Sequence, residues 1–305
     1  MKLVQFHLPG AGIRLGVLQG GRVYDLTAVE PVWDSFLTLV EISRGRADLL
    51  EELVLEKITQ LPDAAYEWEE LDHNAVFSKK HLLMPIFPPE VWGFGVTYQR
   101  SAEARDADVA SQMDSTASIY DRVYHSERPE CFFKATAPRC VGPNGPIGIR
   151  SDSELTATEP ELAYVLGVDR EIIGYTICND VSAWDLERDN PLYLPQSKIF
   201  TGCCALGPVI ATPSEIPDPY ALKISCRIIR SGEVIYSDTT DSGRIGRRFE
   251  ELNEYLYRDN PIPPGTVVST GTGIMVPNEH NLRDGDVVEI EIEGIGVLSN
   301  TAIRL

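Results

Sequence analysis

The stretch that decides the fold runs from Thr158 to Trp184 and reads TEPELAYVLGVDREIIGYTICNDVSAW. It predicts two antiparallel strands, because apolar, aromatic and β-branched residues dominate both halves while the polar VDRE between them is typical of a tight turn. With that turn centred on its two middle residues, Glu159 faces Asp180 and Glu161 faces Cys178. This register brings three carboxylates to one face of the strand pair.

The carboxylates of Glu159, Glu161 and Asp180 form the candidate metal site. Residues two apart on a strand share a face, and carboxylates this close repel one another unless a cation compensates their charge. Oxygen ligands without Cys or His favour Mg²⁺, Mn²⁺ or Ca²⁺ over zinc. An acidic surface on an acidic protein would show the same spacing. The run 160–166, however, carries apolar side chains on both faces. This predicts burial, and buried carboxylates need a partner, which favours a metal.

Composition bounds the class of protein and its partners. With 305 residues and 43% hydrophobic content, the chain can form one large or two smaller globular domains. The net charge of −19 argues against nucleic acid and anionic membranes as partners, because both would be repelled. No apolar run approaches the roughly 20 residues of a membrane helix, and no targeting segment is apparent, so a cytoplasmic location is expected. The six cysteines show no CxxC spacing and predict reduced, packed thiols, with a catalytic thiol at Cys178 as a minor alternative.

The order of elements predicts an α+β protein that is mostly β, with a small N-terminal domain (1–80) and a larger catalytic domain (81–305). Residues 3–26 alternate as three short strands around Gly-rich turns, and residues 36–61 carry apolar side chains at helical spacing. Further strands are expected at 204–210, 222–230, 266–270, 286–292 and 296–303, and a short amphipathic helix at 245–257.

Two segments of the larger domain are expected to border a site. The polar helix Ser101–Tyr124 is rich in Ala, Asp and Ser, which suits a mobile lid, although an exposed helix without that role fits equally well. The stretch LERDNPLYLPQSKIF, residues 186–200, contains two prolines and bulky apolar residues. It predicts an ordered, non-helical loop that carries Lys198.

Four motifs, in this order, resemble the fumarylacetoacetate hydrolase superfamily: EPELAYVLG, GYTICNDVSAWDLE, KIFTGCCALGP and VVSTGTG. The resemblance covers residues 85–305 and implies a mixed β-roll core. It also implies a divalent metal, Mg²⁺ or Mn²⁺, held by a Glu-x-Glu pair and an Asp, which are Glu159, Glu161 and Asp180 here. Members of this superfamily act on 2-oxo acids or 1,3-diketones as homodimers or homotetramers.

Two further motifs, RPECFFKAT and NPLYLPQSK, are similar to those of the branch that dehydrates 2-keto-3-deoxy sugar acids. This similarity implies metal-dependent conversion of a substrate of the 2-keto-3-deoxy-D-arabinonate type to 2,5-dioxopentanoate. Glu130 would remove the C3 proton, and Lys198 would bind the substrate and assist departure of the C4 hydroxyl. Thr270, Thr272 and Arg100 are expected to contact the substrate.

The chain departs from the superfamily pattern in two places. The stretch GVTYQRSAEA has Thr97, Ser101 and Ala104 where hydrolase and decarboxylase members resemble GxNYxxHxxE, so the His–Glu dyad that activates water is missing. A metal-dependent hydrolase or decarboxylase of acylpyruvates or diketo acids is therefore the alternative, and elimination is favoured over it. The other departure is Trp184, where an Arg is usual.

Two other functions remain open from the sequence. A Schiff-base enzyme would use Lys198 on the same keto acids, but a lysine beside three carboxylates would keep its proton. A catalytically silent binding or scaffold protein would have no reason to keep the carboxylate trio and the lysine.

Overall fold

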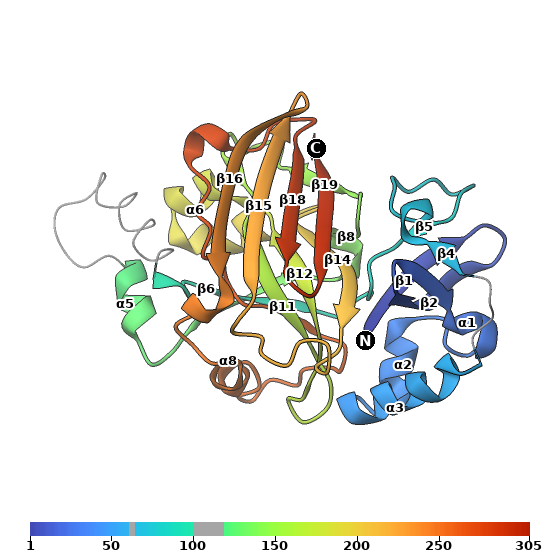
Figure 1. The fold of residues 1–305 in the computed structure, drawn as a ribbon. Coiled ribbons are helices and arrows are strands. Elements are labelled where there is room, and N and C mark those ends of the chain that lie inside the picture. Colours follow the sequence, from blue (N-terminus) through green and yellow to red (C-terminus); the bar gives the residue numbers. More distant parts are fainter. Residues whose placement is uncertain (61–64, 100–118) are drawn as a thin grey trace.

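The computed structural model describes residues 1–60, 65–99 and 119–305, and it shows a mostly β protein with mixed sheets (Figure 1). The predicted polar helix falls almost entirely outside this part of the chain, which contains only its end, α5. The strands are β1 (Lys2–Leu8), β2 (Gly12–Gln19), β3 (Arg22–Asp25), β4 (Tyr66–Glu67), β5 (His81–Leu82), β6 (Val91–Gly95), β7 (Glu130–Ala135), β8 (Cys140–Val141), β9 (Pro146–Ile149), β10 (Thr156–Ala157), β11 (Pro160–Leu166), β12 (Ile172–Asp180), β13 (Ser182–Ala183), β14 (Cys204–Ala211), β15 (Lys223–Arg230), β16 (Glu233–Asp241), β17 (Val267–Ser269), β18 (Val287–Ile292) and β19 (Gly296–Arg304). The helices are α1 (Leu26–Val29), α2 (Phe36–Ile42), α3 (Ala47–Ile58), α5 (Ile119–His125), α6 (Trp184–Asp189), α7 (Leu194–Lys198) and α8 (Phe249–Leu256), and the 3₁₀ turns are η1 (Trp68–Glu70), η2 (Ala137–Arg139), η3 (Pro191–Tyr193), η4 (Ser242–Arg244) and η5 (Asn278–His280).

Two sheets pack against each other to form the core. The larger has the order β4-β3-β2-β1-β14-β12-β11-β17-β6-β7, with β5 on β1 and β8 on β14, and the smaller has the order β16-β15-β18-β19-β9. Strands β15, β18 and β19 contact β11, β12 and β14, and Figure 1 shows the smaller sheet in front of these strands. Alternate residues of β15 point inward, so Ile224, Cys226 and Ile228 are buried between the sheets.

The predicted hairpin lies near the middle of the larger sheet, as β11 and β12. Glu161 pairs with Cys178, and the Asp180 amide donates to the Glu159 carbonyl at 3.0 Å, which confirms the predicted register. Every residue of β11 is buried, since β12 and β17 flank it on either side.

The turn of this hairpin also forms as predicted. Asp169 and Arg170 adopt φ of 50° and 68°, as the two central residues of a two-residue hairpin turn require. The ladder shifts register between Leu166 and Val165 and then continues in the predicted register from the Val165–Gly174 pair to Glu161 and Cys178. The turn and this shift together set which carboxylates share a face.

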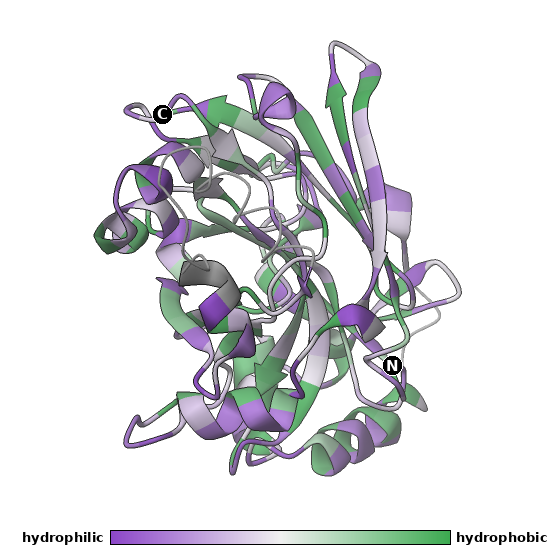
Figure 2. Ribbon diagram, turned by 90° about the vertical axis from the view of Figure 1, so that its left-hand side faces the viewer, coloured by the Kyte–Doolittle hydropathy of each residue, from purple (hydrophilic) through white to green (hydrophobic). Residues whose placement is uncertain are grey.

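The N-terminal strands belong to the larger sheet. Strand β1 pairs with β2 on one side and, through Lys2 and Leu3, with β14 on the other. Helices α2 and α3 lie beside these strands (Figure 1). Figure 2 shows green and purple segments alternating along the outer helices, as amphipathic helices that pack one face require. The division into domains 1–80 and 81–305 stays a prediction, because pairing continues across it.

The structure corrects three predicted elements. The helical stretch 36–61 is two helices, because Arg44 and Gly45 turn out of α2 with φ of 54° and 64°. The segment 186–200 is not a non-helical loop, since it contains most of α6, the turn η3 and all of α7. Pro195 is tolerated there because it lies in the first turn of α7, where no backbone donor is needed. The helix predicted at 245–257 begins only at Phe249.

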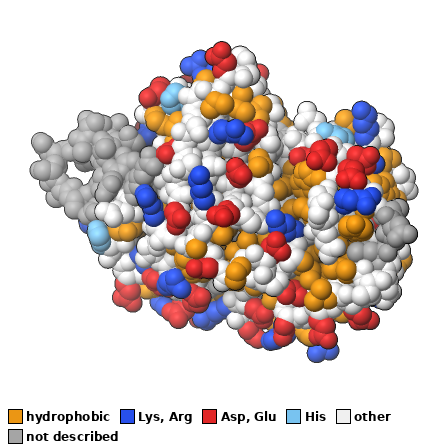
Figure 3. All heavy atoms as spheres, in the orientation of Figure 1, with side chains coloured by type: hydrophobic (Ala, Val, Ile, Leu, Met, Phe, Trp, Pro, Cys, Tyr) orange, Lys and Arg blue, Asp and Glu red, His pale blue; other side chains and the backbone are white. Residues whose placement is uncertain are grey.

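The surface shows charges of both signs. On the face drawn in Figure 3, Lys and Arg side chains are interspersed with Asp and Glu side chains over the front sheet, and no continuous basic area is seen among the coloured residues. Within the described ranges, no helix is long and apolar enough to cross a membrane.

Candidate metal centre and active site

Glu159, Glu161 and Asp180 meet as predicted. Each offers a carboxylate oxygen, and these oxygens lie within 4.8 Å of one another. The three side chains are at most 3% exposed. Glu159 directly precedes β11, Glu161 lies within it and Asp180 ends β12, so the hairpin alone assembles the cluster.

The surroundings of Glu161 show how strongly the three carboxylates repel one another. Its Oε2 accepts hydrogen bonds from the Ser269 hydroxyl and, at 2.8 Å, from the Gly271 amide. Burial, together with the charges of Asp180 and Glu159, nevertheless raises the pKa of Glu161 to about 8. A divalent cation would relieve this repulsion. The all-oxygen donor set therefore fits Mg²⁺ or Mn²⁺.

Lys198 lies at the end of α7, directly against the carboxylates. Its Nζ donates to both oxygens of Glu159 at 3.1 Å and to Asp180 Oδ2 at 3.0 Å. It also donates to the Ser182 hydroxyl at 2.7 Å. Two carboxylates around one ammonium favour its charged form, which suits a proton donor better than an amine nucleophile.

Lys134 is a second buried lysine, and it lies in the motif RPECFFKAT, four residues after Glu130. It is fully buried on β7, with Nζ 2.5 Å from Asp180 Oδ1. The Nζ also donates to the carbonyls of Val181 and Lys198 at 2.9 and 2.7 Å. Burial by itself lowers the pKa of Lys134, but the charge of Asp180, the nearby Cys203 and the hydrogen bond to Asp180 together outweigh that effect and the pKa is raised. Lys134 thus holds Asp180 in place.

Trp184, the unusual residue of the motif, contacts the metal site. It begins α6 and is buried, and its indole Nε1 donates to Glu159 Oε1 at 2.7 Å. The guanidinium of Arg188, one turn later, lies 5.2 Å from the centroid of the indole ring. The tryptophan therefore orients a carboxylate that the sequence predicts as a metal ligand.

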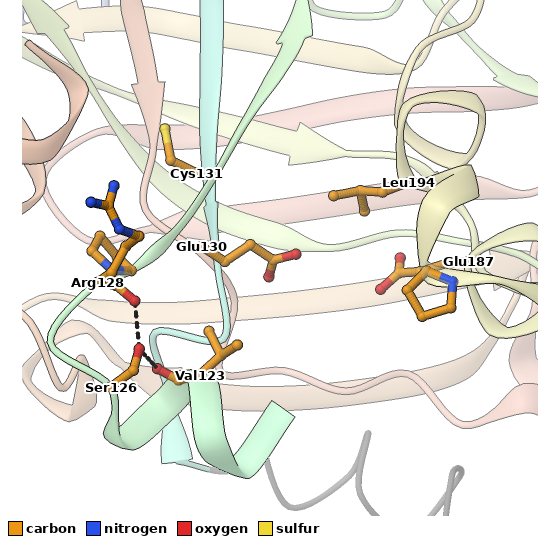
Figure 4. Close-up of a pocket in the computed structure, with 9 residues that line it drawn as sticks. Val123, Ser126, Arg128, Glu130, Cys131, Glu187 and Leu194 are labelled. Atoms are coloured by element: carbon orange, nitrogen blue, oxygen red, sulfur yellow. Dashed lines mark hydrogen bonds between the residues drawn. The ribbon is translucent and has the colours of Figure 1, made fainter. Parts of the chain in front are cut away.

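Glu130 begins β7 and faces a pocket of about 490 Å³. Figure 4 shows its carboxylate pointing into the pocket, with Glu187 of α6 pointing in from the opposite side. The sequence did not single out Glu187. The pocket is lined by Val123, Ser126, Arg128, Pro129, Glu130, Cys131, Glu187, Pro191 and Leu194.

One face of β7 connects this pocket with the carboxylate cluster. Glu130 and Phe132 are two apart on the strand and share that face, while Lys134 follows at a register shift of β7 against β6 and reaches the same cluster. Glu130 lines the pocket, the Lys198 ammonium lies 5.1 Å from the centroid of the Phe132 ring, and Lys134 binds Asp180. Period-two spacing in ECFFK was the sequence signal that could have placed Lys134 near the site.

The remaining candidate residues differ in what the structure shows of them. The Thr270 hydroxyl donates to the Leu162 carbonyl at 2.8 Å. The Thr272 hydroxyl accepts from the Ile274 amide at 3.1 Å. Both therefore shape the loop after β17, and their contact with substrate stays a prediction. Arg100 lies outside the described residues.

Cys178 is not suited to be a catalytic thiol. A hydrogen bond with Cys204 and burial raise its pKa well above the usual range, and its Sγ lies 3.7 Å from that of Cys204 within the core. Five of the six cysteines are buried and all are free, as the sequence predicts.

Comparison with known proteins identifies the family. The model of the fumarylacetoacetate (FAA) hydrolase C-terminal family matches residues 91–303. The chain belongs to this family.

Similar proteins narrow the comparison. The chain is 52% identical over 215 residues to 2-dehydro-3-deoxy-D-arabinonate dehydratase of Saccharolobus solfataricus, covering 70% of this chain and 72% of that relative. It is 40% identical over 288 residues to a probable 2-keto-3-deoxyxylonate dehydratase of Haloferax volcanii, covering 94% of each. A solved structure of 2-keto-3-deoxy-D-arabinonate dehydratase complexed with magnesium and 2,5-dioxopentanoate superimposes with a TM-score of 0.81 at 36% identity, over 100% of this chain and 99% of that one.

Proposed function

We propose that this family member is a magnesium-dependent hydro-lyase that converts a 2-keto-3-deoxy sugar acid, of the 2-keto-3-deoxy-D-arabinonate type, to 2,5-dioxopentanoate. The observation that carries the proposal is the combination of the buried carboxylate cluster with Lys198 in direct contact and Glu130 at the adjoining pocket. The similarity to dehydratases of this class, one of them solved with magnesium and the product, supports it.

Glu159, Glu161 and Asp180 would hold the magnesium ion, and manganese suits the same oxygen ligands. When bound, the ion supplies Lewis acidity towards the 2-keto group and so acidifies the hydrogens on C3. Trp184 and Lys134 keep two of the carboxylates oriented from behind.

The chain's own residues then move the protons. Glu130 accepts the proton from C3 as the C3–H bond breaks, because its carboxylate faces the pocket. Lys198 donates a proton to the C4 hydroxyl, which leaves as water while a double bond forms between C3 and C4. A proton then leaves C5 and one is added at C3, which moves the double bond to C4–C5 and gives an enol. Transfer of the enol O–H proton to C4 gives the aldehyde at C5.

A coupled assay tests the reaction. The purified protein receives 2-keto-3-deoxy-D-arabinonate and Mg²⁺, and an NAD(P)⁺-linked semialdehyde dehydrogenase reports 2,5-dioxopentanoate. We expect product formation that EDTA abolishes. Absence of product together with cleavage of an acylpyruvate panel would instead establish the hydrolase alternative.

Two variants separate the metal from the acid. Glu159→Ala is expected to lose both Mg²⁺ binding and turnover. Lys198→Ala is expected to keep Mg²⁺ binding, measured by calorimetry, and to lose turnover. Turnover by Lys198→Ala at the wild-type rate would remove this lysine from the mechanism, and borohydride trapping of substrate on Lys198 would favour the Schiff-base alternative.

The proposal extends to the setting of the enzyme. We infer a homodimer or homotetramer in the cytoplasm, acting on a small 2-keto acid without nucleic-acid or membrane partners. The net charge of −19 supports the last point, and analytical ultracentrifugation measures the assembly.

A further inference from the structure

Strand β6 carries two glycines directly opposite the side chains of β7 that border the site. Gly95 pairs with Glu130, and Gly93 pairs with Phe132. Directly paired residues project to the same face of a sheet. The side chains of Glu130 and Phe132 therefore project beside glycines, which have no side chain of their own.

The Glu130 carboxylate occupies the place of the missing side chain. A Cβ built on Gly95 would lie 1.9 Å from Glu130 Oε2 and 2.8 Å from the carboxyl carbon. Both distances are far inside van der Waals contact, so Glu130 can keep this position only because residue 95 is a glycine.

From this close approach of the Glu130 carboxylate to Gly95, we propose that Gly95 is a positioning residue for the base Glu130. The inference rests on the proposed function of Glu130 and adds the residue that makes room for its observed rotamer. A glutamate has three rotatable side-chain bonds, and a general base must meet its proton within hydrogen-bond reach. The space beside Gly95 allows the carboxylate the orientation in which it faces the pocket (Figure 4), and a side chain at residue 95 would exclude that orientation.

The backbone gives no competing reason for a glycine at this position. Gly95 is not among the glycines with positive φ in the described chain, so its conformation is open to alanine. A glycine within a strand weakens it, because it costs chain entropy and packs no side chain. The steric relation with Glu130 supplies the reason that the backbone does not.

The close approach of Glu130 to Gly95 also makes alanine at position 95 a suitable test of the inference. The atoms that a methyl group would meet belong to the far end of a flexible side chain and not to backbone. Glu130 can yield by rotating, so the fold and the carboxylate cluster should remain intact while the carboxylate moves. A misplacement of about 1 Å is enough to cost on the order of 10²-fold in rate.

The experiment compares Gly95→Ala, Glu130→Gln and the double variant. For each we measure kcat and KM with 2-keto-3-deoxy-D-arabinonate, Mg²⁺ affinity by calorimetry and Tm. Proton removal is followed separately, by NMR, as exchange of the C3 hydrogens of 2-oxobutanoate in D₂O. This analogue carries the 2-keto acid group but has no hydroxyl to lose.

We expect Gly95→Ala to lower kcat and the exchange rate by about 10- to 100-fold, with Mg²⁺ affinity, Tm and KM close to wild type. In the Glu130→Gln background the same change should have no further effect, because a residue that acts through Glu130 cannot act without it.

Three results would overturn the inference, and they are distinguishable. If Gly95→Ala has the wild-type kcat while Glu130→Gln is inactive, the space beside Gly95 does not matter for catalysis. The assignment of Glu130 as the base would still stand. A large loss of Tm or Mg²⁺ affinity would show that backbone yields instead of the carboxylate. Full turnover by Glu130→Gln would remove the base itself, and with it the proposed role of Glu130.

Discussion

At the scale of single residues, the candidate metal site includes side chains that are not predicted ligands but contact them. Trp184 is the clearest case, because its indole N–H holds Glu159 at 2.7 Å. Partners of this kind tune metal affinity by 10- to 100-fold in characterised metal sites. A residue that breaks the family pattern therefore takes part in building the site.

Trp184→Phe keeps a ring in the same place and removes the donor. We expect Mg²⁺ affinity, measured by calorimetry, to fall about 10-fold or more, with little change in Tm. Trp68→Phe is the matched control, since Trp68 Nε1 also donates to a carboxylate, that of the exposed Asp72, at 3.1 Å. Unchanged Mg²⁺ affinity in Trp184→Phe would contradict an orienting role.

Lys134 concerns stability as well as function. Lys134→Met leaves Asp180 buried without the ammonium that lies 2.5 Å away. Removing one partner of a buried ion pair costs about 3–5 kcal/mol, so we expect a loss of this order in chemical unfolding measured with EDTA present.

An exposed ion pair provides the comparison for Lys134. Lys80 lies 2.6 Å from Glu70 at the surface, where solvent screens the charges and such a pair contributes little to stability. Lys80→Met should therefore change stability little. Equal losses of stability in the two variants would mean that burial does not determine how much the Lys134–Asp180 ion pair contributes to stability.

At the scale of elements, the sequence predicts what is local and misses what depends on tertiary contact. The hairpin β11–β12 and its register follow from alternation and turn chemistry within one short stretch. Helices α6 and α7 have six and five residues, too few to be stable alone, so no local pattern marks them and packing decides their form.

The candidate site likewise has a local part that the sequence predicts and a long-range part that it does not. The three carboxylates come from one hairpin, and their meeting is predictable from residue spacing. Glu130 and Lys198 are distant in the chain, and only the family resemblance linked them to the cluster. The contact between Lys134 and Asp180 joins β7 to β12, which are not neighbours in the sheet. Spacing within β7 could place Lys134 near Glu130, but it does not predict the contact with Asp180.

Strand β6 gives a prediction at this scale. A Cβ on Gly93 would lie 2.5 Å from the ring of the half-buried Phe132, and a rigid ring with two rotatable bonds moves aside less easily than a glutamate carboxylate. Gly93→Ala should therefore destabilise the protein by about 1–3 kcal/mol, as overpacking does. Gly95→Ala is its control on the same strand, and a Tm loss as large in that variant would show that both positions are limited by backbone.

At the scale of the whole molecule, one sheet carries the site and the N-terminal strands together. Strand β1 pairs with β14, which pairs with the metal-site strand β12. Folding of this one sheet buries the carboxylates of the candidate site. Because burial changes their pKa values from those of the unfolded chain, protons that bind at the site affect unfolding.

Glu161 sets the direction in which pH changes the free energy of unfolding. Burial and the charges of Asp180 and Glu159 raise its pKa to about 8 in the folded, metal-free chain, whereas a glutamate in the unfolded chain has a pKa of about 4.3. Between these values the folded state binds more protons. The free energy of unfolding therefore falls as pH rises, by at most about 1.4 kcal/mol per pH unit for one group.

Magnesium should reverse this trend. The ion favours the ionised carboxylate, so its binding releases a proton below about pH 8 and tightens as pH rises. With EDTA we expect Tm to fall between about pH 6 and about pH 8, and with Mg²⁺ the gain in Tm over EDTA should grow across that window. In Glu161→Gln, which cannot ionise at this position, the EDTA curve should be flatter. An unchanged slope in that variant would assign the linkage to other groups. The proton that magnesium displaces would then not be the one on Glu161.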